Sequence, residues 1–153
     1  GTENLLSIAS FSFVSQFLDP QGFVDTLTPL RDKLENFLNE NIQGVRVLGK
    51  SSDRLSNTSC FMVDGLNAES LLMNLDIRGF SIGTGAACSS GNPEPSPVLL
   101  ALGLSREQAQ SSVRVSLGKM TSLEQVDEFG KTMVEVVKHL RSLDPETGEV
   151  VHV

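Results

Sequence analysis

Hydrophobic positions recur with two different periods along the chain, and together these periods predict helices laid on a small sheet. In four segments apolar residues return every three or four positions, which is the spacing of an amphipathic helix. Polar caps, prolines and glycines at the ends of these segments set their bounds. The expected helices run from Thr28-Pro29 to Gly44, from Asn67 to Gly79, from Ser96-Pro97 to Gly103, and from a capping box of Thr121 and Glu124 through Leu140.

Four shorter segments predict strands. Residues 112–117 alternate at period two, which places Val113 and Val115 on one face of a strand and Arg114 on the other. Residues 60–63 are continuously apolar, as expected of a strand in the middle of a sheet. We therefore expect a mixed α/β (α+β) domain with helices packed on a small antiparallel or mixed sheet. The expected strands are residues 45–48, 57–63 and 112–117, and a further strand that starts with residues 80–82.

The segment from Leu5 to Leu18 is apolar on nearly every side. A surface helix of a globular domain shows one apolar stripe, so this segment would need cover on several faces. Two interpretations remain open: a buried helix of the same domain, or a helix whose partner surface lies elsewhere. The turn residues Asp19-Pro20-Gln21-Gly22 then end the segment. We accordingly divide the chain into an apolar helical segment, residues 1–22, and a domain, residues 23–153.

Composition excludes several classes of function. The 153 residues fit one domain, with 39% hydrophobic and 20% charged residues, as in ordinary globular proteins. A net charge of −7 opposes nucleic-acid binding, and no apolar stretch approaches the roughly 20 residues of a membrane span. The start Gly1-Thr2-Glu3-Asn4 lacks the basic beginning of a signal peptide, so we expect a cytoplasmic chain. Two cysteines and two distant histidines, His139 and His152, argue against a metal site of the chain's own.

Cys88 lies in the segment that is poorest in large side chains. Residues 83–95 are almost entirely small residues and prolines, and such a loop cannot bury itself. A thiol there would be accessible, and nearby backbone N–H groups could give it thiolate character. The residues alone favour a reactive thiol but leave open an incidental loop cysteine. Cys60, in contrast, has large apolar neighbours in the sequence and is expected to be structural.

Three further groups are candidates for chemistry. Arg114, in the middle of a strand, either extends to solvent from an edge of the sheet or holds a carboxylate with its planar guanidinium; its surroundings favour the first. Gly83-Thr84-Gly85 has the glycines of a phosphate-binding turn, but its spacing matches no phosphate-binding motif. Lys119 has no evident apolar pocket around it, so we expect a solvated charge.

The segments around Cys88 and Arg114 resemble those of a known family. They are Gly85-Ala86-Ala87-Cys88-Ser89-Ser90-Gly91, Glu94 to Leu99, Ala101 to Leu104, and Ser111 to Gly118. Together they resemble the C-terminal small domain of cysteine desulfurases of the NifS/IscS type, class-V aminotransferase-like enzymes that use pyridoxal 5'-phosphate. The resemblance runs from residue 1 to about residue 143. It implies the fold of the small domain of fold-type I pyridoxal-phosphate enzymes.

The resemblance implies a role for three residues. Cys88 would be the nucleophile that takes sulfur from L-cysteine as a persulfide, leaving L-alanine, and passes it on for iron–sulfur cluster or thio-cofactor assembly. It could also serve as a shared ligand of an iron–sulfur cluster. Arg114 would hold the carboxylate of the substrate, which reverses the interpretation from its own surroundings. Thr2 would contact the cofactor phosphate across a dimer interface.

The same resemblance implies what the chain would need from other parts. The family's cofactor-anchoring lysine lies in a large domain, so we expect residues 1–153 to be inactive alone and not to bind the cofactor covalently. The expected partners are that domain, a second copy in a homodimer, and a sulfur acceptor or iron–sulfur scaffold protein. Residues 5–18 would pack against the large domain and, left uncovered, should cause self-association. The alternatives are a non-catalytic sulfur-relay module that docks a scaffold protein, and a relative without sulfur chemistry.

Overall fold

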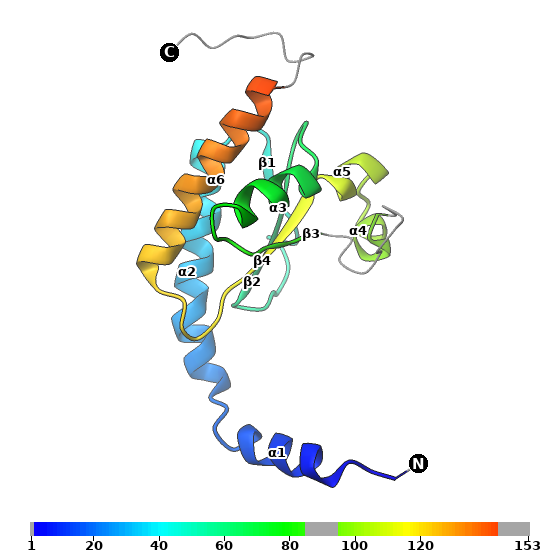
Figure 1. The fold of residues 1–153 in the computed structure, drawn as a ribbon, viewed down its shortest axis with the longest axis vertical. Coiled ribbons are helices and arrows are strands. Elements are labelled where there is room, and N and C mark those ends of the chain that lie inside the picture. Colours follow the sequence, from blue (N-terminus) through cyan, green and yellow to red (C-terminus); the bar gives the residue numbers. More distant parts are fainter. Residues whose placement is uncertain (1, 85–94, 144–153) are drawn as a thin grey trace.

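A computed structural model describes residues 2–84 and 95–143, which fold into helices packed on a small sheet (Figure 1). The helices are α1 (Leu5–Ser15), α2 (Pro20–Asn41), α3 (Ala68–Asp76), α4 (Pro97–Ala101), α5 (Arg106–Gln110) and α6 (Leu123–Leu143). The strands are β1 (Val45–Val47), β2 (Thr58–Val63), β3 (Gly83–Thr84) and β4 (Ser112–Ser116).

The strands form one sheet in the order β1-β2-β4-β3. Each neighbouring pair is antiparallel, which confirms the expected α/β class and decides between an antiparallel and a mixed sheet. Because β4 pairs with both β2 and β3, it is a central strand with a neighbour on each side. This position fixes what lies beside the side chains of β4.

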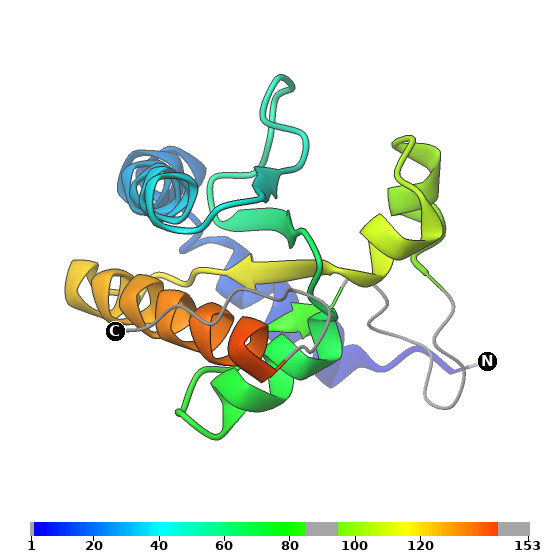
Figure 2. The same ribbon diagram turned by 90° about the horizontal axis from the view of Figure 1, so that it is seen from above.

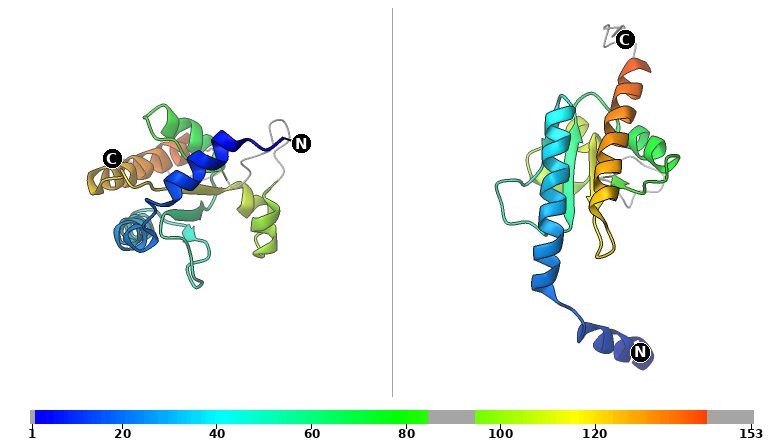
Figure 3. Two further views of the ribbon diagram at one scale, coloured as in Figure 1. Left: turned by 90° about the horizontal axis from the view of Figure 1, so that it is seen from below. Right: turned by 90° about the vertical axis from the view of Figure 1, so that its left-hand side faces the viewer.

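Helices cover both faces of the sheet, but unequally. The long helices α2 and α6, together with α3, pack on one face, whereas the short helices α4 and α5 lie on the other side (Figures 2 and 3). The apolar side chains of β2 and β4 that face the long helices form the main core. Its fully buried members include Leu38, Phe61, Val63, Leu71, Leu75, Val113, Met133 and Val136. A smaller cluster on the other face contains Leu48, Met62, Leu99 and Ala109.

Helix α2 begins nine residues earlier than the sequence predicts. The Asp19 carboxylate accepts a hydrogen bond of 2.9 Å from the Gly22 N–H, and Pro20 occupies the first turn, so these residues start a helix rather than only ending a segment. The expected start at Thr28-Pro29 is therefore wrong, and Pro29 lies inside the helix. Proline lacks one N–H donor, but Leu27 before it and Leu34 after it are buried, and this packing keeps the helix continuous.

Two other bounds shift for equally local reasons. The strand expected to start at residues 80–82 forms, but it starts later, at Gly83 of β3, and the Phe80 ring packs edge-on against Phe129 of α6 at a centroid distance of 5.4 Å. At the start of α6 the reciprocal cap joins Ser122 and Gln125, not Thr121 and Glu124. The Thr121 hydroxyl accepts instead from the N–H of Gly118 in the preceding turn.

Helix α1 stands apart from the rest of the described chain (Figures 1 and 3). None of its residues is buried, and the side chains of Leu6 and Phe11 are 83% and 79% exposed. The interpretation of this segment as a buried helix of the same domain is therefore wrong, and the interpretation with a partner surface elsewhere stays a prediction. Within the described residues, no helix combines the length and the apolar character needed to cross a membrane.

Candidate functional site

Arg114 lies at the centre of the sheet. Strand pairing places it directly opposite Cys60 on one side and Gly83 on the other. The expected alternation is confirmed: Val113 and Val115 are buried, whereas Arg114 is exposed on the opposite face. The expectation that it extends from an edge of the sheet is wrong, because β4 has a partner strand on both sides.

The guanidinium of Arg114 lies against Gly83. A Cβ atom placed on Gly83 would be 3.5 Å from Nη2 and 3.7 Å from Nε of Arg114. Among residues 2–84 and 95–143, no carboxylate pairs with this guanidinium and no acceptor hydrogen-bonds to it. A strand arginine in this state has its planar donor fork available for an anion.

Cys60 is the neutral neighbour of Arg114 on the other side. Its side chain is half-buried and packs against the smaller apolar cluster, as expected of a structural cysteine. Burial raises the pKa of the Cys60 thiol above its ordinary value, and the nearby positive charge of Arg114 lowers it in part. The balance keeps the thiol protonated at neutral pH. The sequence did not indicate that Cys60 lies opposite Arg114, because local residue types do not determine strand register.

The other two predicted site residues are not brought to Arg114 by the described chain. Cys88 lies outside the described residues, four positions after Thr84, where β3 ends. Thr2 is exposed and precedes α1, the helix that stands apart from the sheet (Figure 1). Of the two strands that pair with β4 at Arg114, β3 is therefore the one that leads into the segment carrying Cys88.

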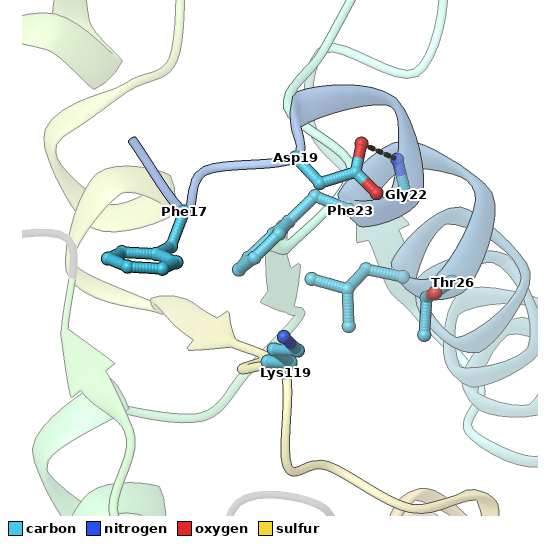
Figure 4. Close-up of a pocket in the computed structure, with 7 residues that line it drawn as sticks. Phe17, Asp19, Gly22, Phe23, Thr26 and Lys119 are labelled. Atoms are coloured by element: carbon cyan, nitrogen blue, oxygen red, sulfur yellow. Dashed lines mark hydrogen bonds between the residues drawn. The ribbon is translucent and has the colours of Figure 1, made fainter. Parts of the chain in front are cut away.

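Lys119 lines a small pocket, which the sequence did not predict. The aromatic rings of Phe17 and Phe23 lie beside it, and Asp19 closes one end with its bond to Gly22 (Figure 4). The pocket has a volume of about 160 Å³. The expected solvated charge is confirmed, because Lys119 is exposed to solvent, although apolar side chains line the pocket beside it.

The described residues do not by themselves fit pyridoxal 5'-phosphate. A lysine that forms a Schiff base needs a desolvated setting, yet Lys33 pairs with Asp127 and the other four lysines are exposed. The pocket beside Lys119 is smaller than the roughly 300 Å³ at which ligand pockets begin. Within residues 2–84 and 95–143, no three histidine, cysteine or acidic side chains gather as metal ligands.

Comparison with known proteins identifies the family. Residues 1–129 match the family described as Aminotransferase class-V. The chain belongs to this family. A solved structure, the NifS-like protein from Rickettsia africae, has the same fold over 90% of this chain and 36% of its own, with a TM-score of 0.78 and 24% sequence identity.

Two similar sequences carry the name cysteine desulfurase. The cysteine desulfurase of Cereibacter sphaeroides is 35% identical over 151 residues, covering 99% of this chain and 39% of the relative. The cysteine desulfurase IscS of Dictyoglomus turgidum is 33% identical over 151 residues, covering 97% of this chain and 38% of the relative. The chain therefore spans about two fifths of the length of these relatives.

Proposed function

We propose that this chain is the C-terminal small-domain part of a pyridoxal-phosphate-dependent cysteine desulfurase. In this proposal residues 23–153 form the domain, and residues 1–22 are a segment that contacts a large cofactor-binding domain. The relatives named cysteine desulfurase support the activity. The absence of a desolvated lysine from the described residues supports a cofactor held elsewhere in the complete enzyme.

The observation that carries the proposal is the guanidinium of Arg114, which has no ion-pair or hydrogen-bond partner among the residues that the structure describes. It lies on a central strand and beside the strand that leads into the Cys88 segment. An amino-acid substrate presents a carboxylate, and a planar guanidinium binds a carboxylate through two parallel hydrogen bonds. Arg114 would orient the substrate by its carboxylate, and Cys88 would receive its sulfur. Thr2 is proposed to contact the cofactor phosphate from a second copy of the chain.

The proposed transfer of sulfur from L-cysteine to Cys88 balances in atoms and electrons without an added oxidant. The C–S bond of L-cysteine breaks and an S–S bond forms at Cys88, which becomes a persulfide. The carbon that loses sulfur gains one hydrogen and becomes the methyl group of L-alanine, and the thiol of Cys88 supplies the balancing proton. The persulfide then passes its outer sulfur to an acceptor thiol, such as that of an iron–sulfur scaffold protein.

The test follows sulfur by peptide mass spectrometry in the complete enzyme that carries this chain. After L-cysteine is added, we expect one extra sulfur atom on the peptide containing Cys88, removable by a thiol reductant. Cys88→Ser should abolish the gain, and the matched variant Cys60→Ser should keep it. A sulfur gain in the Cys88→Ser enzyme would contradict the proposal.

A second measurement tests Arg114 separately from Cys88. Cysteamine resembles cysteine but lacks the carboxylate, so it cannot use the guanidinium. Arg114→Ala should lower kcat/KM for L-cysteine by about 10- to 150-fold, as expected for lost hydrogen bonds to a charged group, while leaving cysteamine turnover unchanged. An equal loss for both substrates would contradict the role in binding the carboxylate.

A further inference from the structure

Three residues on three neighbouring strands form a row across the face of the sheet opposite the long helices α2 and α6. Cys60 of β2 pairs with Arg114 of β4, and Arg114 pairs with Gly83 of β3. Directly opposed residues of antiparallel strands place their side chains on the same face, so the two neighbours flank the arginine. We propose that Gly83 and Cys60 are positioning residues for Arg114. Gly83 leaves space for the guanidinium, and the neutral Cys60 leaves its positive charge available to hold a substrate carboxylate.

Gly83 contributes space. Its backbone is outside the left-handed region, so the glycine is not required by backbone conformation and a larger side chain could be built there without backbone strain. The nearest atoms to an added Cβ are Nη2 and Nε of Arg114, at 3.5 and 3.7 Å. A single methyl group would therefore make an ordinary contact, whereas the two further methyl groups of valine would enter the volume of the guanidinium.

Cys60 places an uncharged side chain opposite Arg114. Its burial keeps the thiol neutral, and no carboxylate of the described chain pairs with Arg114 in its place. An acidic residue opposite the arginine would compete with any substrate carboxylate for the same donors. The inference rests on the proposed role of Arg114 and deepens it, since it names the residues that keep the guanidinium accessible to a substrate carboxylate.

The steric half is tested with Gly83→Ala and Gly83→Val in the complete enzyme. Alanine should leave KM for L-cysteine within about twofold, because its Cβ fits at 3.5 Å. Valine should raise KM for L-cysteine by about tenfold, the loss of one charged hydrogen bond, without changing cysteamine turnover. Valine is favoured in strands, so the fold should persist, and circular dichroism checks it.

The charge half is tested with the matched pair Cys60→Asp and Cys60→Asn. The two side chains have nearly the same size, but only aspartate carries the negative charge that forms an ion pair with the guanidinium. Aspartate should raise KM for L-cysteine by about tenfold, and asparagine should not. This pair decides the inference even if Gly83→Val does not fold.

The outcomes separate this inference from the proposed function. If Arg114→Ala discriminates L-cysteine from cysteamine but neither Gly83→Val nor Cys60→Asp does, the positioning role is wrong and the role of Arg114 stands. If Arg114→Ala discriminates nothing, the proposed function of this residue fails, and the positioning role fails with it.

Discussion

Glu35 of α2 and Arg54 of the connection between β1 and β2 form a two-point ion pair inside the fold. Nη1 and Nη2 of Arg54 donate to Oε1 and Oε2 of Glu35 at 2.7 and 3.0 Å. Glu35 is 1% exposed, and the Ser59 hydroxyl donates a third hydrogen bond of 2.8 Å to Oε1. The hydrogen bonds between Arg54 and the Glu35 carboxylate raise the pKa of Arg54 above its usual value. The carboxylate thus joins a long helix, an exposed connection and the strand β2.

Removing Arg54 alone should destabilise the fold more than removing Arg54 and Glu35 together. Arg54→Met leaves the buried carboxylate of Glu35 without its cation, which should lower the free energy of unfolding by about 3–5 kcal/mol. The double variant Glu35→Leu with Arg54→Met leaves no uncompensated charge and should lose less than the sum of the single changes. Urea unfolding of the wild type, the two single variants and the double variant measures this coupling energy. Additive losses would show that the pair does not act as a unit.

The close approach of α2 and α6 should depend on a glycine. A Cβ on Gly130 would lie 2.8 Å from Cδ1 of Phe37, too close for either side chain to stay in place. Gly130→Ala gains about 1 kcal/mol of helix propensity but should lose about 1–3 kcal/mol to overpacking. We expect a net loss of stability in urea unfolding. In a Phe37→Leu background the same change should be neutral or stabilising, and a loss there would contradict overpacking as the cause.

The fold was largely predictable because the decisive signals are local. The alternation around Arg114 identified the face of β4 correctly, and Asn67 caps α3 as expected, accepting a 2.7 Å hydrogen bond from the Glu69 N–H. The start of α2 was misplaced because Asp19-Pro20 and Thr28-Pro29 offer the same cap chemistry. Only burial on both sides of Pro29, a tertiary property, distinguishes them.

The site was predictable only in part. Arg114 was singled out as a candidate from its residue type and its segment, and its role stays a prediction. Its neighbours Cys60 and Gly83 are distant in sequence and meet it through strand register. Register depends on how whole strands pack, so no local pattern indicates it. The short helix α5 was also missed, although its capping box of Ser105 and Gln108 was visible as a Ser-x-x-Gln signal.

Cys60 should react slowly as a thiol. In a Cys88→Ser background it is the remaining cysteine, and its raised pKa means that iodoacetamide alkylation should reach half its maximal rate at a higher pH than in concentrated urea. Arg114→Ala removes the charge that lowers this pKa, so the midpoint should rise further. A midpoint equal to that in urea, or one that falls in Arg114→Ala, would contradict this electrostatic description.

The same shift gives a stability contribution with a defined sign. The folded pKa of Cys60 is raised, so the fold favours the protonated thiol. This contribution is complete below the unfolded-state pKa of about 8.5 and is lost as the pH rises through the higher folded pKa. Cys60→Ala should therefore reduce the dependence of unfolding free energy on pH in this alkaline range, as measured by urea unfolding at successive pH values.

Helix α1 should make the 153-residue chain associate with itself. Its apolar side chains are exposed all round, and each Å² removed from water contributes about 25 cal/mol to association. Leu6→Glu with Phe11→Glu places charge on the two most exposed of these side chains and should lower the average mass in sedimentation velocity at a fixed concentration. Ser10→Glu adds charge to the same helix without removing apolar surface and should have a smaller effect. A wild-type chain that sediments as a monomer at every concentration would contradict the prediction.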